Sequence, residues 1–592
     1  MKIFIIRLLL SISCIATIYS CDDYLEEVNP NEISADTFFQ NLDESNAILT
    51  GVYGSMLNSW IVSAREEAWR SDMAYPGIRD GNIDNRALNF YQHVILEDNE
   101  FINDRWNALY QVIWRANQLI EGLNGMDSSL QSDQRWTEQM GQARFFRGLA
   151  HFYLHSLYNQ GRIVIRDAAP STSEEFSKPL STSDEVMAFF RADLVYAYEN
   201  LPASFAEKTR ATAGTAATIL GTSYLYSASD NPADYQTAKT YFADVINNGA
   251  YGYSLVQDAS IMFTDAGDFN SESIFEINYT VAQQLEDDNF DEESFFTRNA
   301  RYSAPRESGG SNANQQFTAA SWLIYAYATE PLNLSDARNS VFDRGTNTIR
   351  PRKVSLRSSA MIAMVNDEDT EYYLAPSAPN AVDFGSNQRK YGYFKKYTNH
   401  TIVANENNTG DISWKSGKNV IINRLADVYL MYAECLLMGD GNVQGAIDLI
   451  NPIRQRWALQ LLDANSDLID GTAYSVQSLM DHLMFVERPL ELSVEGVSIR
   501  TIDLRRWGVG SSRFSDLATR SYYLTDYEYY NDENDALESR NNSFVREGIS
   551  PDPSGDPQIV QEYTGAAQFY TDGYLVLPTS ETLNNTSVSS SN

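Results

Sequence analysis

Two stretches of the chain share one helical-hairpin pattern, which points to a body built from repeats. Tyr224 on one predicted helix is followed by Ala238 on the next, and Tyr432 is followed by Ala446, so both steps are 14 residues. In each pair the small alanine lets the helices approach, and the aromatic ring fills the space between them. Hairpins of this kind, similar to a tetratricopeptide repeat with a lengthened turn, bury their apolar faces by stacking. The two hairpins span residues 217–248 and 424–456.

Apolar residues in the N-terminal third of the chain also recur at the intervals typical of an α-helix. Apolar residues recur at intervals of 3, 4, 4 and 3 from Ala143 to Leu157, and a second stripe runs from Trp106 to Ile120. Such spacing places the residues on one face of an α-helix, which usually packs into a core. A glycine, Gly161, is expected to end the first of these helices. The sequence therefore predicts a mainly α-helical, tetratricopeptide-like scaffold.

Residues 251–419 differ in character and predict a large irregular, loop-rich insertion. Their helical periodicity is poor, and they are rich in Asn, Ser, Gly, Asp and aromatic residues, which is typical of loops, short strands and short helices. A second irregular region, about residues 525–574, contains three prolines. We expect residues 41–250 to form an N-terminal helical-repeat portion. Residues 420–592 are expected to form helical hairpins and an irregular tail, joined to the rest in one body.

The first 20 residues have the layout of a secretory signal. Lys2 and Arg7 are their only charges, and the apolar run over residues 8–18 is too short to span a bilayer. Ile-Tyr-Ser then precedes Cys21, which resembles the lipobox of bacterial lipoproteins. We therefore expect cleavage after residue 20, lipidation of Cys21 and an acidic tether over residues 21–40. The lipid would be the only contact with the membrane.

Cysteine content and charge limit the remaining possibilities. The chain has 3 cysteines; Cys14 leaves with the signal, Cys21 is expected to carry lipid, and Cys435 lies in an apolar helical run. One remaining thiol cannot form an intramolecular disulfide, so stability must come from core burial. The formal net charge of −35 disfavours nucleic acids and anionic membranes as partners, because each phosphate must be neutralised by Lys or Arg.

Several motifs, in chain order, resemble those of one family. Residues 424–434 read RLADVYLMYAE, and residues 487–508 contain ER, EL, EG, R and DLRRWG in that order. Residues 574–578 read YLVLP and are followed by Glu581. Together with the lipobox and Asn117, these stretches are similar to the motifs of the SusD/RagB family and cover most of the mature chain.

The resemblance implies a lipoprotein of Bacteroidetes-like bacteria, anchored in the outer membrane and facing the cell exterior. Family members are binding proteins rather than enzymes, with four helical-repeat hairpins as a scaffold and irregular insertions as the binding face. Such a protein would sit as a lid on a SusC-like TonB-dependent transporter and pass captured glycan into it. Two other functions stay open: a surface-anchored glycan hydrolase, and a peptide- or protein-binding member of the same family.

Enzyme and metal motifs are absent from the sequence. It has no H-E-x-x-H, G-x-S-x-G or G-x-x-x-x-G-K-[ST] motif, so no catalytic residue is assigned and no cofactor is expected. His151 and His155 stand four residues apart on a predicted helix, but no Glu or Cys there completes a metal site. The acidic residues 286–293 lack the spaced loop with a turn glycine that binds Ca²⁺. The charged side chains of residues 487–508 are interpreted as ion pairs between packed helices.

Aromatic residues in irregular segments are the candidate ligand contacts. Sugar rings present flat C–H faces that aromatic rings can cover, while polar side chains meet the hydroxyls. Tyr, Phe and Trp make up 12% of the chain, and residues 69–91 and 279–322 combine them with Asp, Asn and Arg. We therefore predict a shallow platform for a neutral or weakly charged oligosaccharide. Its candidate residues are Tyr75, Tyr91, Phe295, Tyr302 and Trp322.

Overall fold

The computed structural model describes residues 39–589 apart from residues 80–81, 84, 171, 283–293, 306–314, 386–388, 407–414 and 560. The predicted signal, Cys21 and the tether up to residue 38 therefore lie outside the described residues, as do the acidic residues 286–293. Within the described part of the chain, no helix is long and apolar enough to cross a membrane.

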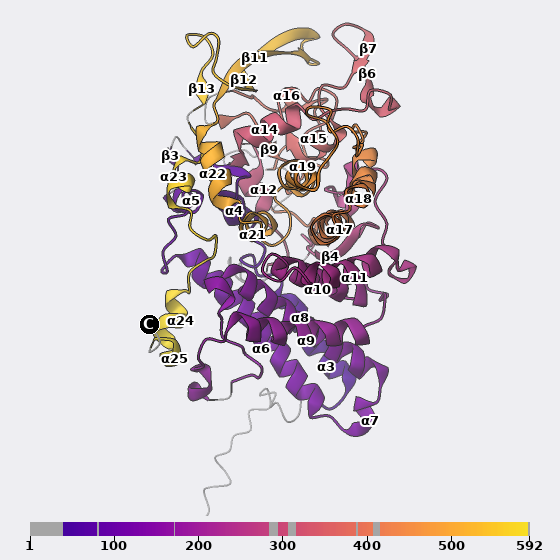
Figure 1. The fold of residues 1–592 in the computed structure, drawn as a ribbon, viewed down its shortest axis with the longest axis vertical. Coiled ribbons are helices and arrows are strands. Elements are labelled where there is room, and N and C mark those ends of the chain that lie inside the picture. Colours follow the sequence, from indigo (N-terminus) through magenta and orange to yellow (C-terminus); the bar gives the residue numbers. More distant parts are fainter. Residues whose placement is uncertain are drawn as a thin grey trace, which may run out of the picture.

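Long helices form one end of the elongated molecule (Figure 1). They are α3 (Leu42–Ser55), α6 (Glu100–Asn124), α8 (Gln134–Leu157), α9 (Ser183–Asn200), α10 (Ala213–Ser227) and α11 (Asp234–Asn247). From α6 onward each of these helices packs against the next, and α3 packs against both α6 and α8. The helical predictions for the N-terminal third are confirmed.

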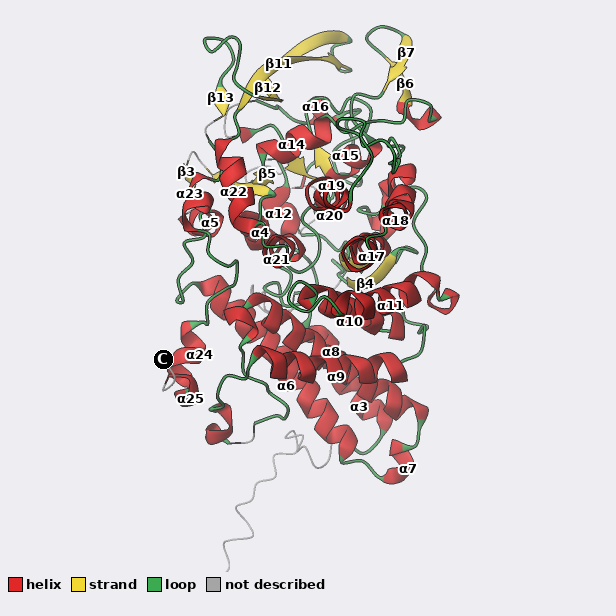
Figure 2. Cartoon of the chain, in the orientation of Figure 1, coloured by secondary structure: helices red, strands yellow, loops and turns green. Residues whose placement is uncertain are grey.

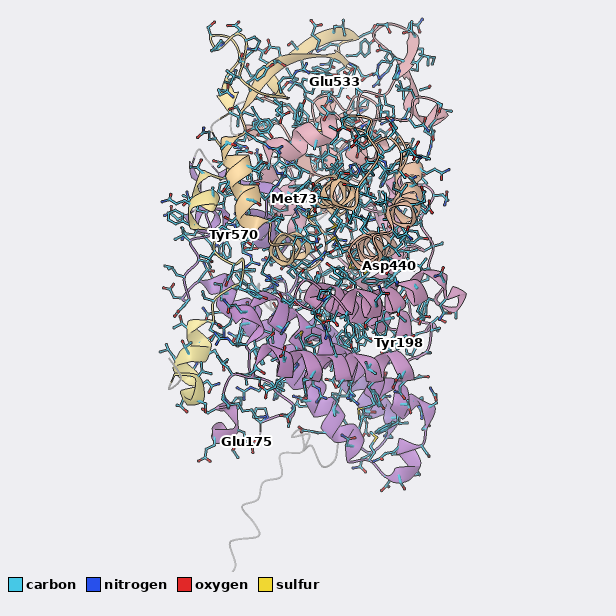
Figure 3. The ribbon with its side chains drawn as sticks, in the orientation of Figure 1. Met73, Glu175, Tyr198, Asp440, Glu533 and Tyr570 are labelled. Carbon is cyan, nitrogen blue, oxygen red and sulfur yellow. The ribbon has the colours of Figure 1, made fainter. Side chains whose placement is uncertain are left out.

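The two predicted hairpins stack on each other. The second hairpin consists of α17 (Leu425–Asp440) and α18 (Val443–Arg456). Helix α17 packs on α10 and α11, and Phe242 of α11 fits against Gly221 of α10, where an added Cβ atom would lie 2.6 Å from the ring. Lys239 donates across 2.7 Å to Asp440, which lies at the end of α17 and is labelled in Figure 3. The prediction of stacked helical hairpins is confirmed.

Local sequence explains where several helices begin and end. Thr182 and Glu185 form a reciprocal capping box at the start of α9. Helix α17 ends at Gly441, whose φ of +65° suits glycine. Helix α8 ends at Leu157, four residues before the predicted stop at Gly161, because Tyr158 already has extended backbone angles.

The insertion is built from short elements, as predicted. Strand β4 (Ser273–Ile277) pairs antiparallel with β10 (Val420–Arg424), which leads directly into α17. The elements between them are α12 (Asn299–Ser303), β5 (Phe317–Ala319), α14 (Ser321–Ala328), β6 (Ser340–Asp343), β7 (Thr348–Pro351), α15 (Leu356–Met361), β8 (Ile362–Ala363), α16 (Ala378–Ala381) and β9 (Tyr393–Phe394).

An N-terminal segment joins this insertion. Its strand β1 pairs with β5, so the chain between α3 and α6 belongs to the same part of the molecule as the insertion. Its elements are α4 (Ala64–Arg70), β1 (Ala74–Pro76), β2 (Ile78–Arg79), β3 (Asn82–Ile83) and α5 (Asn85–Tyr91). A short helix, α7 (Ser128–Gln131), connects α6 to α8.

The region predicted as an irregular tail contains a long β-hairpin, which corrects this part of the prediction (Figure 2). It consists of β11 (Tyr522–Asn531) and β12 (Ala536–Glu547), paired antiparallel. Tyr522 and Leu524 are buried on one face, but an irregularity of the register between Thr525 and Tyr527 interrupts this alternation along β11. Tyr527 donates to Glu368 across 2.6 Å, so the hairpin packs on the insertion.

The other C-terminal elements are mainly short helices. A five-residue π-helical turn, Leu483–Glu487, joins α19 to α20. The elements are α19 (Val476–His482), α20 (Arg488–Leu492), α21 (Ile499–Arg506), α22 (Gly510–Thr519), β13 (Gln558–Ile559), α23 (Thr564–Phe569), α24 (Thr579–Asn584) and α25 (Thr586–Ser589).

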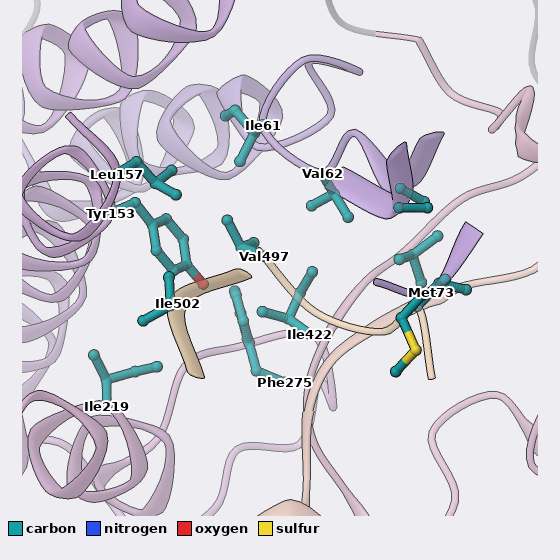
Figure 4. Packing of buried hydrophobic residues seen from close by; sticks show 14 of the residues in the cluster. Ile61, Val62, Met73, Tyr153, Leu157, Ile219, Phe275, Ile422, Val497 and Ile502 are labelled. Atoms are coloured by element: carbon teal, nitrogen blue, oxygen red, sulfur yellow. The ribbon is translucent and has the colours of Figure 1, made fainter. Parts of the chain in front are cut away.

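One hydrophobic cluster connects the helices, the insertion and the C-terminal segment (Figure 4). Leu157 of α8 lies in this cluster with Phe275 of β4 and Ile422 of β10. Val497 and Ile502, from the loop before α21 and from α21 itself, complete the contact. Burial of this continuous apolar surface is the main force that holds the parts together.

Most charged residues of the ER…EL…DLRRWG segment form buried ion pairs, as interpreted from the sequence. Arg505 differs, because no carboxylate of the described residues lies within 4.0 Å of it. Glu491 accepts hydrogen bonds from Arg424 across 2.8 Å and from Arg456 across 2.5 Å. Arg488 donates to Asp427 across 2.8 Å. These contacts fix α20 against both helices of the second hairpin, because a buried charge is tolerated only when it is paired.

Candidate ligand-binding groove

Three adjoining hollows run beside β4 and the turn after α3. Their volumes are about 80, 310 and 380 Å³. Leu57 lines both the first and the second hollow. Glu207, Arg210 and Glu276 line both the second and the third. Since neighbouring hollows share walls, we describe them together as the groove.

The first hollow places two half-buried aromatic rings beside fixed polar groups. Trp60, in the turn after α3, and Tyr302 of α12 both line it. The guanidinium of Arg65 lies 4.3 Å from the centre of the Tyr302 ring, and its Nε donates to Glu66 across 2.8 Å. Burial raises the pKa of Glu66, but the charge and hydrogen bonds of Arg65 outweigh burial and hold this pKa below its usual value. The ion pair therefore stays charged and keeps Arg65 on the ring.

The second hollow is more apolar. Phe295 and Tyr53 contribute aromatic rings to it, together with the side chain of Met56. Tyr53 donates to Gln142 across 2.7 Å and accepts from the backbone N–H of Ala211 across 2.8 Å. Burial raises the pKa of Tyr53, so this hydroxyl stays neutral and its hydrogen bonds hold the ring in place.

The third hollow again combines rings with polar groups. The rings of Tyr251 and Tyr253 lie 5.8 Å apart at its edge, and Tyr251 is oriented by a 2.7 Å hydrogen bond to Asp244. Glu276 accepts hydrogen bonds from the backbone of Phe269 and from the Asn419 side chain. Aromatic faces and oriented polar groups therefore alternate along the whole groove, which suits a ligand with apolar faces and hydroxyl edges.

The structure places the five predicted ligand residues in two groups. Phe295 and Tyr302 line the groove. Tyr75 is half-buried and lies apart from it, with the Arg389 guanidinium 3.6 Å from its ring centre. Tyr91 and Trp322 are only 5% and 4% exposed, so as placed here neither offers a ring face at the surface, and we correct their interpretation to core residues.

Hydrogen bonds satisfy the polar atoms of the buried Tyr91 and Trp322 rings. The hydroxyl of Tyr91 accepts from the backbone N–H of Tyr563 across 2.6 Å, and the indole N–H of Trp322 donates to the backbone carbonyl of Asp72. Long-range contacts of this kind leave no signal in the sequence, because Tyr and Trp occur both at surfaces and in cores.

Other residues of the groove were missed by the sequence analysis. Trp60 and Tyr53 belong to the end of a helix and the turn after it, where an aromatic residue usually indicates core. Asp72, one of the acidic residues of the stretch 69–91, is fully buried. Phe290, Arg306 and Asn312, in the stretch 279–322, lie outside the described residues.

The described residues contain no group of three or more His, Cys, Asp or Glu side chains arranged to hold a metal ion. The imidazole of His151 is hydrogen-bonded to the Arg147 carbonyl across 2.8 Å, and that of His155 to Ser183 across 2.8 Å. Both rings therefore serve helix packing. Cys435 is buried, as predicted, and burial raises its pKa, so this thiol is unreactive.

Comparison with known proteins identifies the family. A model described as the SusD family matches residues 271–587, which is more than half of the chain. The chain belongs to the SusD family. A second model, described as starch-binding associating with outer membrane, matches residues 23–225. The family assigned from sequence motifs is thus confirmed.

Individual relatives are distant but match over most of their length. The chain is 24% identical to the SusD-like protein P25 of Formosa agariphila over 87% of this chain and 92% of that protein. Two solved structures share the fold. One, solved with a xylogluco-oligosaccharide, has a TM-score of 0.63 at 19% identity and covers 92% of this chain and 97% of its own. The other, a laminarin-binding SusD-like protein, has a TM-score of 0.60 at 20% identity over 81% and 94% of the two chains.

Proposed function

We propose that this protein is a cell-surface lipoprotein that binds an oligosaccharide or polysaccharide nutrient and delivers it to a SusC-like TonB-dependent transporter. The observation that carries the proposal is the groove, in which half-buried aromatic rings alternate with oriented polar groups. Membership of the SusD family supports the same conclusion. Two similar structures, one laminarin-binding and one solved with a xylogluco-oligosaccharide, support a glycan as the ligand.

The groove favours modest affinity for an extended glycan. Each hydroxyl exchanges a hydrogen bond to water for one to the protein, with a net gain of ~0.5–1.5 kcal/mol. A ring stacked on Tyr302 or Trp60 adds roughly 1 kcal/mol, by analogy with aromatic pairs. A few such contacts correspond to dissociation constants of roughly micromolar to millimolar. Three connected hollows favour a linear chain of several sugar units over a single sugar.

Calorimetry with a panel of neutral linear oligosaccharides tests the ligand class, with a panel of unstructured peptides as the alternative. We expect saturable binding of at least one glycan and a loss of affinity of about fivefold in Tyr302→Ala, the factor that corresponds to roughly 1 kcal/mol. Tyr530→Ala, on the distant β11–β12 hairpin, is the matched control and should bind normally. Binding of peptides alone would favour a peptide-binding family member, and release of new reducing ends from the bound glycan would favour a hydrolase.

The lipid anchor and the transporter are tested separately. Labelled palmitate should enter the wild-type protein but not Cys21→Ala, and the wild type should fractionate with the outer membrane. Equal labelling of both proteins would contradict lipidation at Cys21. The transporter partnership predicts that the solubilised lipoprotein co-purifies with a TonB-dependent outer-membrane transporter. Purification without such a protein would remove delivery from the proposal and leave glycan binding to be tested on its own.

A further inference from the structure

A cavity larger than any hollow of the groove lies away from it, on the helical scaffold. It has a volume of about 850 Å³ and is lined by α8, α9, α10, residues 230–234 up to the start of α11, the end of α21 and the segment around Tyr574. It shares no lining residue with the three hollows of the groove. We call it the helical cleft. Figure 1 shows α8, α9 and α10 stacked at the end of the molecule opposite the β11–β12 hairpin.

Arg505 is a half-buried cation at this cleft. Its guanidinium carbon lies 3.7 Å from the centre of the Tyr574 ring, and its Nη2 donates to the Ser156 carbonyl across 2.7 Å. Its Nη1 is buried and has no hydrogen-bond partner. Among the described residues no carboxylate lies within 4.0 Å of Arg505, whereas the neighbouring Arg506 pairs with Glu434.

The charged residues that line the cleft are two arginines, Arg191 and Arg505, and three aspartates, Asp184, Asp230 and Asp234. Burial, together with the positive charges of Arg505 and Arg191, lowers the pKa of His155 to about 3, so this ring is neutral near pH 7. Arg191 lies over the Tyr224 ring at 3.9 Å, and its nearest carboxylate, on Asp234, is 3.9 Å away. Within the part of the chain that the structure describes, none of these carboxylates forms an ion pair with the guanidinium of Arg505.

The remaining walls suit a sugar ring. The rings of Tyr226 and Tyr574 are half-buried at the cleft, and the hydroxyls of Ser183 and Ser227 supply polar edges. Asp184 and Asp230 also line the cleft, but both are exposed and are therefore screened by water and salt. A group with one negative charge beside Arg505 would neutralise this poorly hydrated cation from the cleft, which the Arg505 side chain lines, and charge-assisted hydrogen bonds to a guanidinium are strong.

We propose that the helical cleft is a second ligand site, which binds an acidic sugar unit with its carboxylate or sulfate on Arg505 and its ring against Tyr574 or Tyr226. This proposal rests on the proposed glycan binding but uses a separate surface. It predicts that the protein discriminates acidic from neutral glycans at the cleft, while the groove binds through neutral contacts.

Calorimetry with a trimer of galacturonic acid tests the site, because its methyl ester keeps the rings and removes the charge. We expect the acid to bind at least tenfold more tightly than the ester. Arg505→Gln should lose that preference, while Arg505→Lys, which keeps the charge but not the planar fork, should retain part of it. Arg546→Gln, an exposed arginine on β12, is the charge-matched control and should behave as wild type. A sulfated disaccharide separates sulfate from carboxylate as the preferred anion.

The variants also separate this proposal from the groove. Tyr302→Ala should weaken binding of a neutral oligosaccharide and leave the acid preference intact, and Arg505→Gln should do the reverse. Equal affinity for the acid and its ester, no detectable binding of either acidic sugar, or an acid preference that survives in Arg505→Gln would overturn the second site and leave the groove untouched. If Arg505→Gln does not fold, chemical-shift changes of the wild-type Arg505 side chain on titration with the acid decide the question.

Discussion

Asp72 and Arg500 form a two-point ion pair, although 428 residues of chain separate them. The two oxygens of Asp72 accept from Nε and Nη2 of Arg500 across 2.7 and 2.8 Å, and Arg513 donates to the same carboxylate across 2.7 Å. Both Asp72 and Arg500 are buried. The contact joins the segment after α4 to α21 and α22, so it links an N-terminal segment of the chain to two C-terminal helices.

Replacing Asp72 by Asn should therefore destabilise the fold rather than weaken a ligand site. The change leaves two buried guanidinium groups without their anion, which costs about 3–5 kcal/mol. Urea unfolding should show a lower midpoint for Asp72→Asn, while Asp526→Asn, at an exposed position on β11, should change it little. An unchanged midpoint in Asp72→Asn would mean that the buried pair contributes no net stability.

Periodicity made the helical scaffold predictable, but it could not place Asp72. The 14-residue steps from Tyr224 to Ala238 and from Tyr432 to Ala446 depend on local geometry, and the structure reproduces both hairpins. Asp72 is buried by partners that are distant in sequence, and no local pattern reports such partners. The β11–β12 hairpin was missed because its pattern is irregular: the register shifts between Thr525 and Tyr527, and Leu537 of β12 is exposed.

Acid should destabilise the protein through Glu491. Burial raises the pKa of this carboxyl, but the charges of Arg456 and Arg424 outweigh burial and bring the pKa to about 2, against 4.5 for an ordinary Glu. A lowered folded-state pKa contributes stability above pH ~4.5, and this contribution is lost as the pH falls through about 2. The loss amounts to roughly 3 kcal/mol.

The unfolding free energy of the wild-type protein should decrease as the pH is lowered from 6 to 2. Glu491→Gln should be less stable than wild type at pH 6 and should lose less stability on acidification, since it no longer titrates there. Parallel pH profiles for the wild type and the variant would show that other carboxyls carry the acid sensitivity.

The ionised Asp268 side chain should lower the stability of the protein at neutral pH, in contrast to that of Glu491. Partial burial raises its pKa to about 6, and the nearby carboxylates of Glu276 and Asp265 act in the same direction. A raised folded-state pKa contributes stability below the unfolded value of 3.8, and this stability is lost as the pH rises through about 6. Asp268→Asn should therefore be more stable than wild type at pH 7.5, by about 1 kcal/mol after allowance for partial solvent exposure.

Thermal melts at two pH values check the prediction for Asp268. The variant should melt above wild type at pH 7.5, while the difference should shrink at pH 4, where the wild-type carboxyl is already protonated. The backbone N–H of Asn419, which donates to Asp268 across 3.2 Å, can still donate to the amide oxygen of Asn. A variant that is less stable at both pH values would show that this contact needs the charge.

The candidate groove shows where sequence reasoning about sites reached its limit. Composition and irregular segments directed attention to Phe295 and Tyr302, which line the groove. The same reasoning also selected Tyr91 and Trp322, which are buried. An aromatic ring in a loop can serve a ligand or a local core, and only the tertiary contacts distinguish the two.

Trp322 and Tyr302 therefore make a decisive pair of substitutions. Trp322→Ala should lower the unfolding free energy by about 3–5 kcal/mol, because it removes a buried indole and its hydrogen bond to the Asp72 carbonyl. It should leave glycan affinity unchanged when measured well below the melting temperature. Tyr302→Ala should weaken glycan binding and change the unfolding free energy little, because its half-buried ring lines the groove. Tyr302→Phe keeps the ring and should bind glycan nearly as well as wild type. Thermal melts and calorimetry on the same samples give both quantities, and a loss of glycan affinity in folded Trp322→Ala would return that residue to the ligand site.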